Sequence, residues 1–317
     1  MITDPKEKLA LIKRNTAEVV TERELETLVR TVEKPVVYCG YEPSGPVHLG
    51  HMVTISKLID FENAGFKVKI LMADWHAWLN RKGDWDFIRN AAKEWEKAFK
   101  RLGLKNAEYI LGSSFQMKEE YITDVFELAE EISVSRALRS MQTVARESEN
   151  AKASQMIYPL MQIADIKHLK VDAVEAGIEQ RKIYMLAREH ISRIGYKKLP
   201  YVYTPLINSL LGPGDKMSSS IPNSMISTED DAASIKDKIK KAYCKEKELD
   251  GNPILEIARY VVMPRTKELI IPRPKKYGGK LIFTSQEEIE RSFRAGELHP
   301  MDLKTAVAEH LIKILKK

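Results

Sequence analysis

Cysteine is almost absent from this sequence, and so are the long apolar runs of membrane proteins. Cys39 and Cys244 are the two cysteines among 317 residues, too few and too isolated for a disulfide framework or a cysteine-based zinc site. No apolar run is long enough to span a bilayer. Residues 1–14 are charged and amphipathic, unlike a secretory signal. These absences predict a cytoplasmic protein with no membrane segment and no protein-held metal.

The charge of the chain is only mildly basic. A formal net charge of +6 and a pI near 9.0 suit a polyanionic partner, although such an excess is more often a solvated surface. The sequence is 44% hydrophobic and 30% charged, as in ordinary globular proteins, and it contains no internal repeat. Its length predicts a large core with one small appended domain.

Strand-like and helix-like stretches alternate along the first two thirds of the chain, with short connections. This alternation predicts an α/β fold with a parallel, doubly wound (Rossmann-like) sheet. Beyond Thr228 the pattern is wholly helical and strongly basic over residues 236–241, which places a domain boundary between 1–227 and 228–317. The expected strands are 36–39, 67–73, 108–112, 171–177 and 201–206, and the expected helical stretches are 5–32, 51–64, 85–102, 118–146 and 180–194.

The stretch VVYCGYEPSGPVHLGH, residues 36–51, predicts a strand, a tight turn and the start of a helix. Free N–H groups at a helix N-terminus favour phosphate, and His48 and His51 add donors. Gly50 removes a side chain where a nucleotide would approach the backbone. From the residues alone, two surface helix histidines are the simpler interpretation, and a metal pair is a further option.

A second informative stretch is Lys216-Met217-Ser218-Ser219-Ser220, in a loop that follows Gly212-Pro213-Gly214. It resembles the KMSKS loop of class I aminoacyl-tRNA synthetases, and the His48 to His51 stretch resembles the HIGH motif of the same class. Ser219 stands where that loop has its second lysine, so one fixed positive charge is missing.

Three polar side chains fall on one face of a predicted helix. Tyr158, Gln162 and Asp165 lie at positions i, i+4 and i+7, flanked by apolar residues. Buried polar groups need partners, and a bound ligand can supply them.

Together these stretches and the Gly177-x-Glu-Gln180-Arg-Lys182 turn resemble the compact tyrosyl-tRNA synthetases of archaea and eukaryotes, over nearly the whole chain. The resemblance implies a homodimer that activates L-tyrosine with ATP, Mg²⁺ assisting, and transfers it to tRNA(Tyr). It also implies an anticodon-binding role for the mainly helical C-terminal domain. The catalytic domain is expected to have N-terminal helices and an insertion that takes part in dimerisation and in binding the acceptor stem.

The same resemblance implies roles for individual residues. For L-tyrosine these are Tyr38 and Asp165 at the phenol, and Tyr158, Gln162 and Gln180 at the amino group. For ATP they are Gly40, Glu42, Pro43, Ser44, Gly45, His48, Gly50, His51, Lys216, Met217, Ser218, Ser219 and Ser220, with His48, His51, Lys216 and Ser219 catalytic. For tRNA they are Arg139, Arg181 and Lys182 at the acceptor stem, and Tyr277 and Asp302 at the anticodon.

Several alternatives stay open at this level. A tryptophanyl-tRNA synthetase shares the fold and both loops, but Tyr38 and Asp165 suit a phenol better than an indole. A non-catalytic RNA-binding relative and a nucleotidylyltransferase with a His-x-Gly-His site are more distant possibilities. For Arg136, Arg139 and Arg146 a solvated helix face is the simpler interpretation, and Asp302 suits an N-terminal helix cap.

Overall fold

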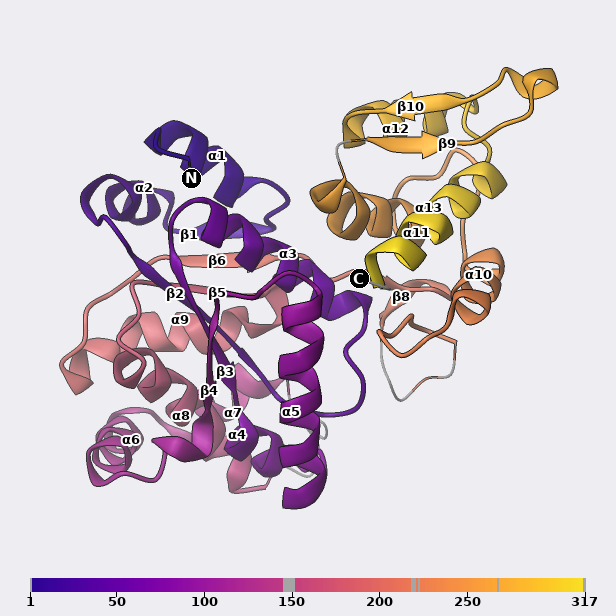
Figure 1. The fold of residues 1–317 in the computed structure, drawn as a ribbon. Coiled ribbons are helices and arrows are strands. Elements are labelled where there is room, and N and C mark those ends of the chain that lie inside the picture. The colour runs from indigo at the N-terminus through magenta and orange to yellow at the C-terminus, as the bar shows by residue number, and fades with distance from the viewer. Residues whose placement is uncertain (1, 145–151, 218–220, 222, 267, 316–317) are drawn as a thin grey trace. The chain divides into compact units, whose positions relative to one another are not determined.

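The computed structural model describes residues 2–144, 152–217, 221, 223–266 and 268–315. The chain forms two compact units (Figure 1). The first unit comprises Met1–Ser44 and Lys57–Pro205, and the second comprises Gly45–Ser56 and Leu206–Lys317. In the described part of the chain, no helix has the length and apolar character needed to cross a membrane.

A six-stranded sheet forms the centre of the first unit, in the order β1-β6-β5-β2-β3-β4. All neighbouring pairs are parallel except β1 with β6, which is antiparallel. The strand order reverses between β2 and β5, the point at which open α/β sheets bind ligands beyond the strand ends. The predicted doubly wound sheet is therefore confirmed. The strands are β1 (Glu18–Val20), β2 (Val36–Tyr41), β3 (Lys67–Met72), β4 (Glu108–Leu111), β5 (Ala173–Gly177) and β6 (Tyr201–Thr204).

The helices of this unit follow the predicted order, with two corrections. Residues 5–32 are not helical throughout, because β1 pairs with β6 between α1 and α2. The described part of the stretch predicted to be helical over 118–146 forms two helices, α6 and α7, with a break at Ile132 and Ser133. The α-helices are α1 (Pro5–Lys13), α2 (Glu22–Thr31), α3 (Leu49–Asn63), whose residues 49–56 belong to the second unit, α4 (Asp74–Leu79), α5 (Trp85–Arg101), α6 (Glu119–Glu131), α7 (Val134–Met141), α8 (Ser154–His168) and α9 (Arg181–His190).

Helix α2 begins with a capping box, as the Thr21-Glu22-Arg23-Glu24 sequence predicts. Thr21 Oγ1 accepts from Glu24 N at 3.2 Å, and Glu24 Oε2 accepts from Thr21 N at 3.4 Å. Each side chain thereby satisfies one backbone donor at the helix end, which is a capping box.

One face of the sheet carries the core that surrounds the site. Tyr38 on β2 and Val174 and Ala176 on β5 share a buried cluster with Ile163 and Ala164 of α8. Because side chains alternate along a strand, Tyr38 points to this face and its neighbours do not. Figure 1 shows α6, α8 and α9 grouped on the same side of the sheet.

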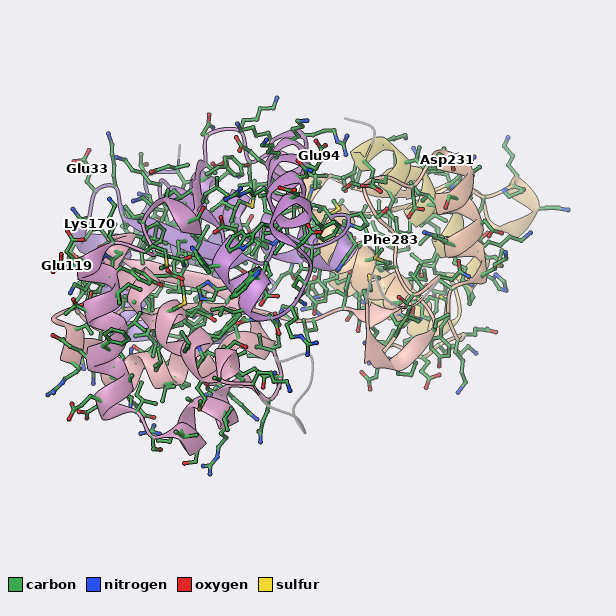
Figure 2. The ribbon with its side chains drawn as sticks, turned by 90° about the horizontal axis from the view of Figure 1, so that it is seen from below. Glu33, Glu94, Glu119, Lys170, Asp231 and Phe283 are labelled. Carbon is green, nitrogen blue, oxygen red and sulfur yellow. The ribbon has the colours of Figure 1, made fainter. Side chains whose placement is uncertain are left out.

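The second unit is mainly helical but contains two short strand pairs. The expectation of wholly helical structure beyond Thr228 is wrong at β9 (Leu269–Ile271) and β10 (Leu281–Phe283), which are antiparallel and too short to show a period of two. Figure 2 shows Phe283 on β10 and Asp231 at the start of α10. A domain division at Thr228 stays a prediction. The other elements are β7 (Asn208–Ser209), β8 (Gly212–Lys216), α10 (Ala232–Lys241), α11 (Pro253–Ile257), α12 (Gln286–Ala295) and α13 (Pro300–Leu315).

Candidate active site

A buried carboxylate, Asp165 on α8, lies at the centre of the polar groups in the first unit. Its Oδ1 accepts from Gln116 Nε2 at 2.7 Å and from the Tyr121 hydroxyl at 2.8 Å. Its Oδ2 accepts no hydrogen bond from the described residues and lies 3.7 Å from His76 Nε2. Burial raises the pKa of Asp165 to about 7, and the two donors offset part of that effect. This carboxylate therefore has one oxygen fixed by the protein and one available to a hydroxyl group.

Gln116, Tyr121 and His76 are site residues that the sequence interpretation missed. The one sequence feature that pointed to any of them was the position of His76 shortly after the carboxyl end of β3, where open α/β sheets bind ligands. Gln116 Nε2 lies 3.4 Å from His76 Nδ1, and burial lowers the pKa of His76 to about 4, so the ring is neutral near pH 7. Gly112 makes room for the amide, because a β carbon there would lie 2.3 Å from Gln116 Oε1.

Tyr38 reaches the same buried region from β2. Its side chain is 1% exposed, and its hydroxyl lies 3.0 Å from the hydroxyl of Tyr184 on α9. Burial raises the pKa of Tyr38, and the charges of Tyr184 and Asp165 raise it further. The charge of Asp165 therefore acts on Tyr38, which is compatible with the tyrosine interpretation, and the Tyr38 hydroxyl is held by Tyr184.

The residues expected at the amino group form a second polar cluster along α8. Gln162 Nε2 donates to Gln180 Oε1 at 3.3 Å, and the Tyr158 hydroxyl donates to Glu42 Oε1 at 2.5 Å. Tyr158, Gln162 and Asp165 do lie on one helix, and all three are buried. Glu42, expected beside the nucleotide, contacts a residue expected beside tyrosine.

The histidine motif belongs to the second unit, where its rings are ordered by backbone donors. Gly50 N donates to His48 Nδ1, and His48 N donates to His51 Nδ1, each at 3.1 Å. Both Nδ1 atoms are therefore acceptors, which places the ring proton on Nε2 in each neutral imidazole. Burial lowers the pKa of His48 to about 4.

Gly50 is required by this arrangement. A β carbon there would lie 2.9 Å from His48 Cε1 and 3.0 Å from His48 Nδ1. The steric demand on Gly50 thus comes from His48 itself, in addition to the nucleotide approach expected from the sequence.

The two interpretations based on simpler histidine roles find no support. Both rings are partly buried, which is unlike solvated surface histidines. Among the residues that the structure describes, no group of three or more His, Cys, Asp or Glu side chains could hold a metal ion.

Backbone hydrogen bonds connect the histidine motif to the segment after the Lys216 loop. Leu49 N donates to Ile226 O at 3.0 Å, and Thr228 N donates to Val47 O at 2.8 Å. Lys216 ends strand β8, and Met217 is buried. Ser218, Ser219 and Ser220 lie outside the described residues, as does the side chain of Lys216.

Of the other residues expected at the nucleotide, Gly40 lies on β2, and Pro43, Ser44 and Gly45 lie shortly after that strand. Gly45 has a φ of 62°, a left-handed conformation that glycine adopts without strain.

The residues expected at the acceptor stem lie on the first unit. Arg139 is exposed on α7, and Lys182 Nζ donates to Gln142 Oε1 at 2.8 Å. Arg181 pairs with Glu18 through two guanidinium nitrogens, one of them Nη2 at 2.8 Å from Oε1. Arg146 lies outside the described residues.

The residues expected at the anticodon lie on the second unit. Asp302 is in the first turn of α13, but the cap role expected for it belongs to His299, whose Nδ1 accepts from Met301 N at 3.2 Å. No hydrogen bond to the Asp302 carboxylate is present among the described residues. Tyr277 ends a short 3-10 turn, Lys275–Tyr277, and its side chain lies outside the described part.

Comparison with known proteins places this geometry in a family. Residues 31–316 match the family described as tRNA synthetases class I (W and Y). A tyrosine–tRNA ligase of Methanoculleus marisnigri is 52% identical, with 96% of this chain and 95% of the relative covered. The crystal structure of a tyrosyl-tRNA synthetase from Archaeoglobus fulgidus, complexed with L-tyrosine, has a TM-score of 0.96 at 47% identity over 99% of this chain and 98% of that chain.

A tryptophanyl-tRNA synthetase of Aeropyrum pernix is also similar, with a TM-score of 0.73 at 22% identity, covering 93% of this chain and 80% of that chain. At that identity the likeness shows a shared fold only. On the match over residues 31–316 and the relatives near 50% identity, this chain belongs to the class I tRNA synthetases of the tryptophan and tyrosine family.

Proposed function

We propose that this chain is a tyrosine–tRNA ligase, which activates L-tyrosine with ATP and transfers it to tRNA(Tyr). The observation that carries the proposal is the buried Asp165, whose Oδ2 accepts no hydrogen bond from the described residues and whose charge acts on the buried Tyr38. Such a pair matches the single hydroxyl of a phenol and leaves an indole ring without a partner for the carboxylate. Relatives about 50% identical over nearly their whole length carry the same name.

The first step joins tyrosine to AMP. A carboxylate oxygen of tyrosine attacks the α-phosphorus of ATP, the bond to the β-phosphate oxygen breaks, and pyrophosphate leaves. No general base is needed, because the amino acid carboxylate is already ionised near pH 7. The protein contributes position and charge stabilisation, with His48 and His51 donating from Nε2 and Lys216 contributing an ammonium.

The second step transfers tyrosine to RNA. A hydroxyl of the 3′-terminal ribose attacks the carbonyl carbon of tyrosyl-AMP, and AMP leaves. Arg139, Arg181 and Lys182 are proposed to hold the acceptor stem, and Tyr277 and Asp302 the anticodon. Residues 1–227 would then be the catalytic domain and residues 228–317 the anticodon-binding domain, in a cytoplasmic homodimer.

Any Mg²⁺ would be held by the phosphates of ATP, because the described residues offer no cluster of metal ligands. The serines of the Lys216 loop, Ser218 to Ser220, remain proposed nucleotide residues on sequence grounds alone.

The test is which amino acid drives ATP–pyrophosphate exchange. Tyrosine should support exchange, whereas phenylalanine, which leaves Tyr38 and Asp165 unpaired, should be rejected by a factor that reaches about 10⁵ in tyrosyl-tRNA synthetases themselves. Exchange driven by tryptophan would identify a tryptophanyl enzyme instead. If none of these amino acids supports exchange, a non-catalytic RNA-binding relative is favoured.

A further inference from the structure

A group of buried tyrosines lies behind Tyr38 and has no role in the steps above. Tyr184 on α9 packs against Tyr201 and Tyr203 of β6, with ring centroids 5.4 Å and 6.5 Å away. The hydroxyl of Tyr184 lies 3.0 Å from that of Tyr38. The hydroxyls of Tyr201 and Tyr203 accept and donate no hydrogen bond within the described part of the chain. Tyr184 is therefore the member of the group that can act on the substrate-facing hydroxyl.

The number of hydroxyl hydrogens determines which of Tyr38 and Tyr184 donates to the other once tyrosine is bound. An ionised Asp165 can only accept, so the phenol hydrogen of the substrate goes to Asp165. The phenol oxygen then needs a donor, and Tyr38 is the hydroxyl expected there. Having given its one hydrogen to the substrate, Tyr38 must accept from Tyr184. The 3.0 Å contact between the two hydroxyls is compatible with this direction.

The surroundings of Tyr184 are compatible with this direction. Burial raises the pKa of Tyr184, so its hydroxyl keeps its hydrogen and can donate it to Tyr38. Hydrogen bonds that run in one direction along such a chain strengthen one another in a buried site.

We infer that Tyr184 is a specificity-determining residue, whose hydroxyl directs the Tyr38 hydroxyl onto the phenol oxygen of the substrate. The inference rests on the proposed tyrosine specificity. Tyr184 acts through Tyr38, and so it is a positioning residue. Discrimination against phenylalanine then depends on a side chain with no contact to the substrate.

Tyr184→Phe tests this with the smallest change of shape. We expect kcat/KM for tyrosine in ATP–pyrophosphate exchange to fall roughly 2- to 10-fold, the range of one net hydrogen bond, while kcat/KM for phenylalanine stays about the same. Tyr201→Phe is the matched control, because it removes one hydroxyl from the same buried group at a position with no hydrogen bond to lose. It should leave the tyrosine to phenylalanine ratio unchanged.

A double-mutant cycle separates positioning from general packing. Because Tyr184 acts through Tyr38, the double variant Tyr38→Phe/Tyr184→Phe should match Tyr38→Phe in its tyrosine to phenylalanine ratio. An unchanged ratio in Tyr184→Phe, additive losses in the double variant, or an equal loss in Tyr201→Phe would each overturn the inference. Wild-type protein that shows no tyrosine-dependent exchange would instead overturn the proposed function.

Discussion

The Tyr158 hydroxyl donates to Glu42 Oε1 across 2.5 Å and joins helix α8 to the residue that follows β2. The same carboxylate accepts from Asn80 Nδ2 at 3.0 and 3.1 Å and lies 3.3 Å from Lys82 Nζ. Because its hydrogen is committed to Glu42, the Tyr158 oxygen presents only lone pairs to other groups, which suits an ammonium. If Tyr158 holds the amino group of tyrosine as proposed, Glu42 acts on that group through this bond, alongside its predicted place at the nucleotide.

Glu42→Gln should weaken tyrosine binding. A carboxylate is a stronger acceptor for Tyr158 than an amide, so the dissociation constant for tyrosine should rise by roughly 10-fold or more. Calorimetric titration measures this, with 3-(4-hydroxyphenyl)propanoate as the ligand that lacks an amino group. Glu33→Gln, at an exposed position of the same unit (Figure 2), is the control. Equal weakening for both ligands would show that Glu42 does not act on the amino group.

Tyrosine binding should depend on pH through Asp165, whose pKa burial raises to about 7. Only the ionised carboxylate takes the phenol hydrogen, so affinity should fall towards about tenfold per pH unit below that value. His76, with a pKa lowered to about 4 by burial, stays neutral in this range. Titrations between about pH 5.5 and 8 check the slope, which Asp165→Asn should abolish.

Acid unfolding driven by Asp165 would not explain such a loss. A folded pKa above the unfolded value means that this group stabilises the fold most below about pH 3.9, and that the stabilisation is lost as pH rises through about 7. Thermal melting at each pH is therefore the control. A slope that persists in Asp165→Asn would assign the titration to another group.

Gly50→Ala should impair adenylate formation and spare tyrosine binding. The new β carbon would lie 2.9 Å from His48 Cε1, so the ring must move away from the Gly50 N donor. Loss of one positioned donor predicts a fall of roughly 10²-fold in the single-turnover rate. Tyrosine affinity, measured on the same variant, should hold because Tyr38 and Asp165 belong to the first unit. A wild-type rate would remove His48 from the phosphate role.

Glu18→Gln should improve tRNA use. Arg181 is paired with Glu18 in the structure, and an acceptor-stem phosphate or base would compete with that carboxylate. Partly exposed ion pairs are worth about 0–1 kcal/mol, so the KM for tRNA should fall by up to about 5-fold. Glu130→Gln, which frees the exposed Arg193, is the matched control. A KM that is unchanged, or that falls equally in the control, would argue against Arg181 at the acceptor stem.

Asp302→Asn should lower aminoacylation without lowering the melting temperature. His299 holds the cap of α13, so the change removes charge and one acceptor but no cap. Recognition of the anticodon base that Asp302 is proposed to contact should weaken by about 1–3 kcal/mol, while ATP–pyrophosphate exchange is unaffected. Asp231→Ala is the opposite control, since Asp231 accepts from Ser234 N at 2.7 Å and its loss should cost about 1 kcal/mol of stability. Wild-type charging by Asp302→Asn would remove the anticodon role.

Features set by near neighbours in the chain could be predicted from the sequence. The capping box of Thr21 and Glu24 and the shared face of Tyr158, Gln162 and Asp165 depend on helical geometry over a few residues. The alternation of strands and helices predicted the sheet for the same reason. The order of its strands was not predicted, because it depends on pairing between segments that are far apart in the sequence.

Features set by distant contacts required the tertiary structure. Residues 18–20 become a strand because β6, far along the chain, offers them hydrogen bonds, and β9 becomes one by pairing with β10. The partners of Asp165, which are Gln116 and Tyr121, lie 49 and 44 residues away in sequence. No periodicity records such a pairing, because hydrogen bonds between buried side chains depend on how the helices pack. The sequence by itself determined that Tyr158, Gln162 and Asp165 are polar and lie on one helix face, and the packing decided which oxygen of Asp165 has no partner among the described residues.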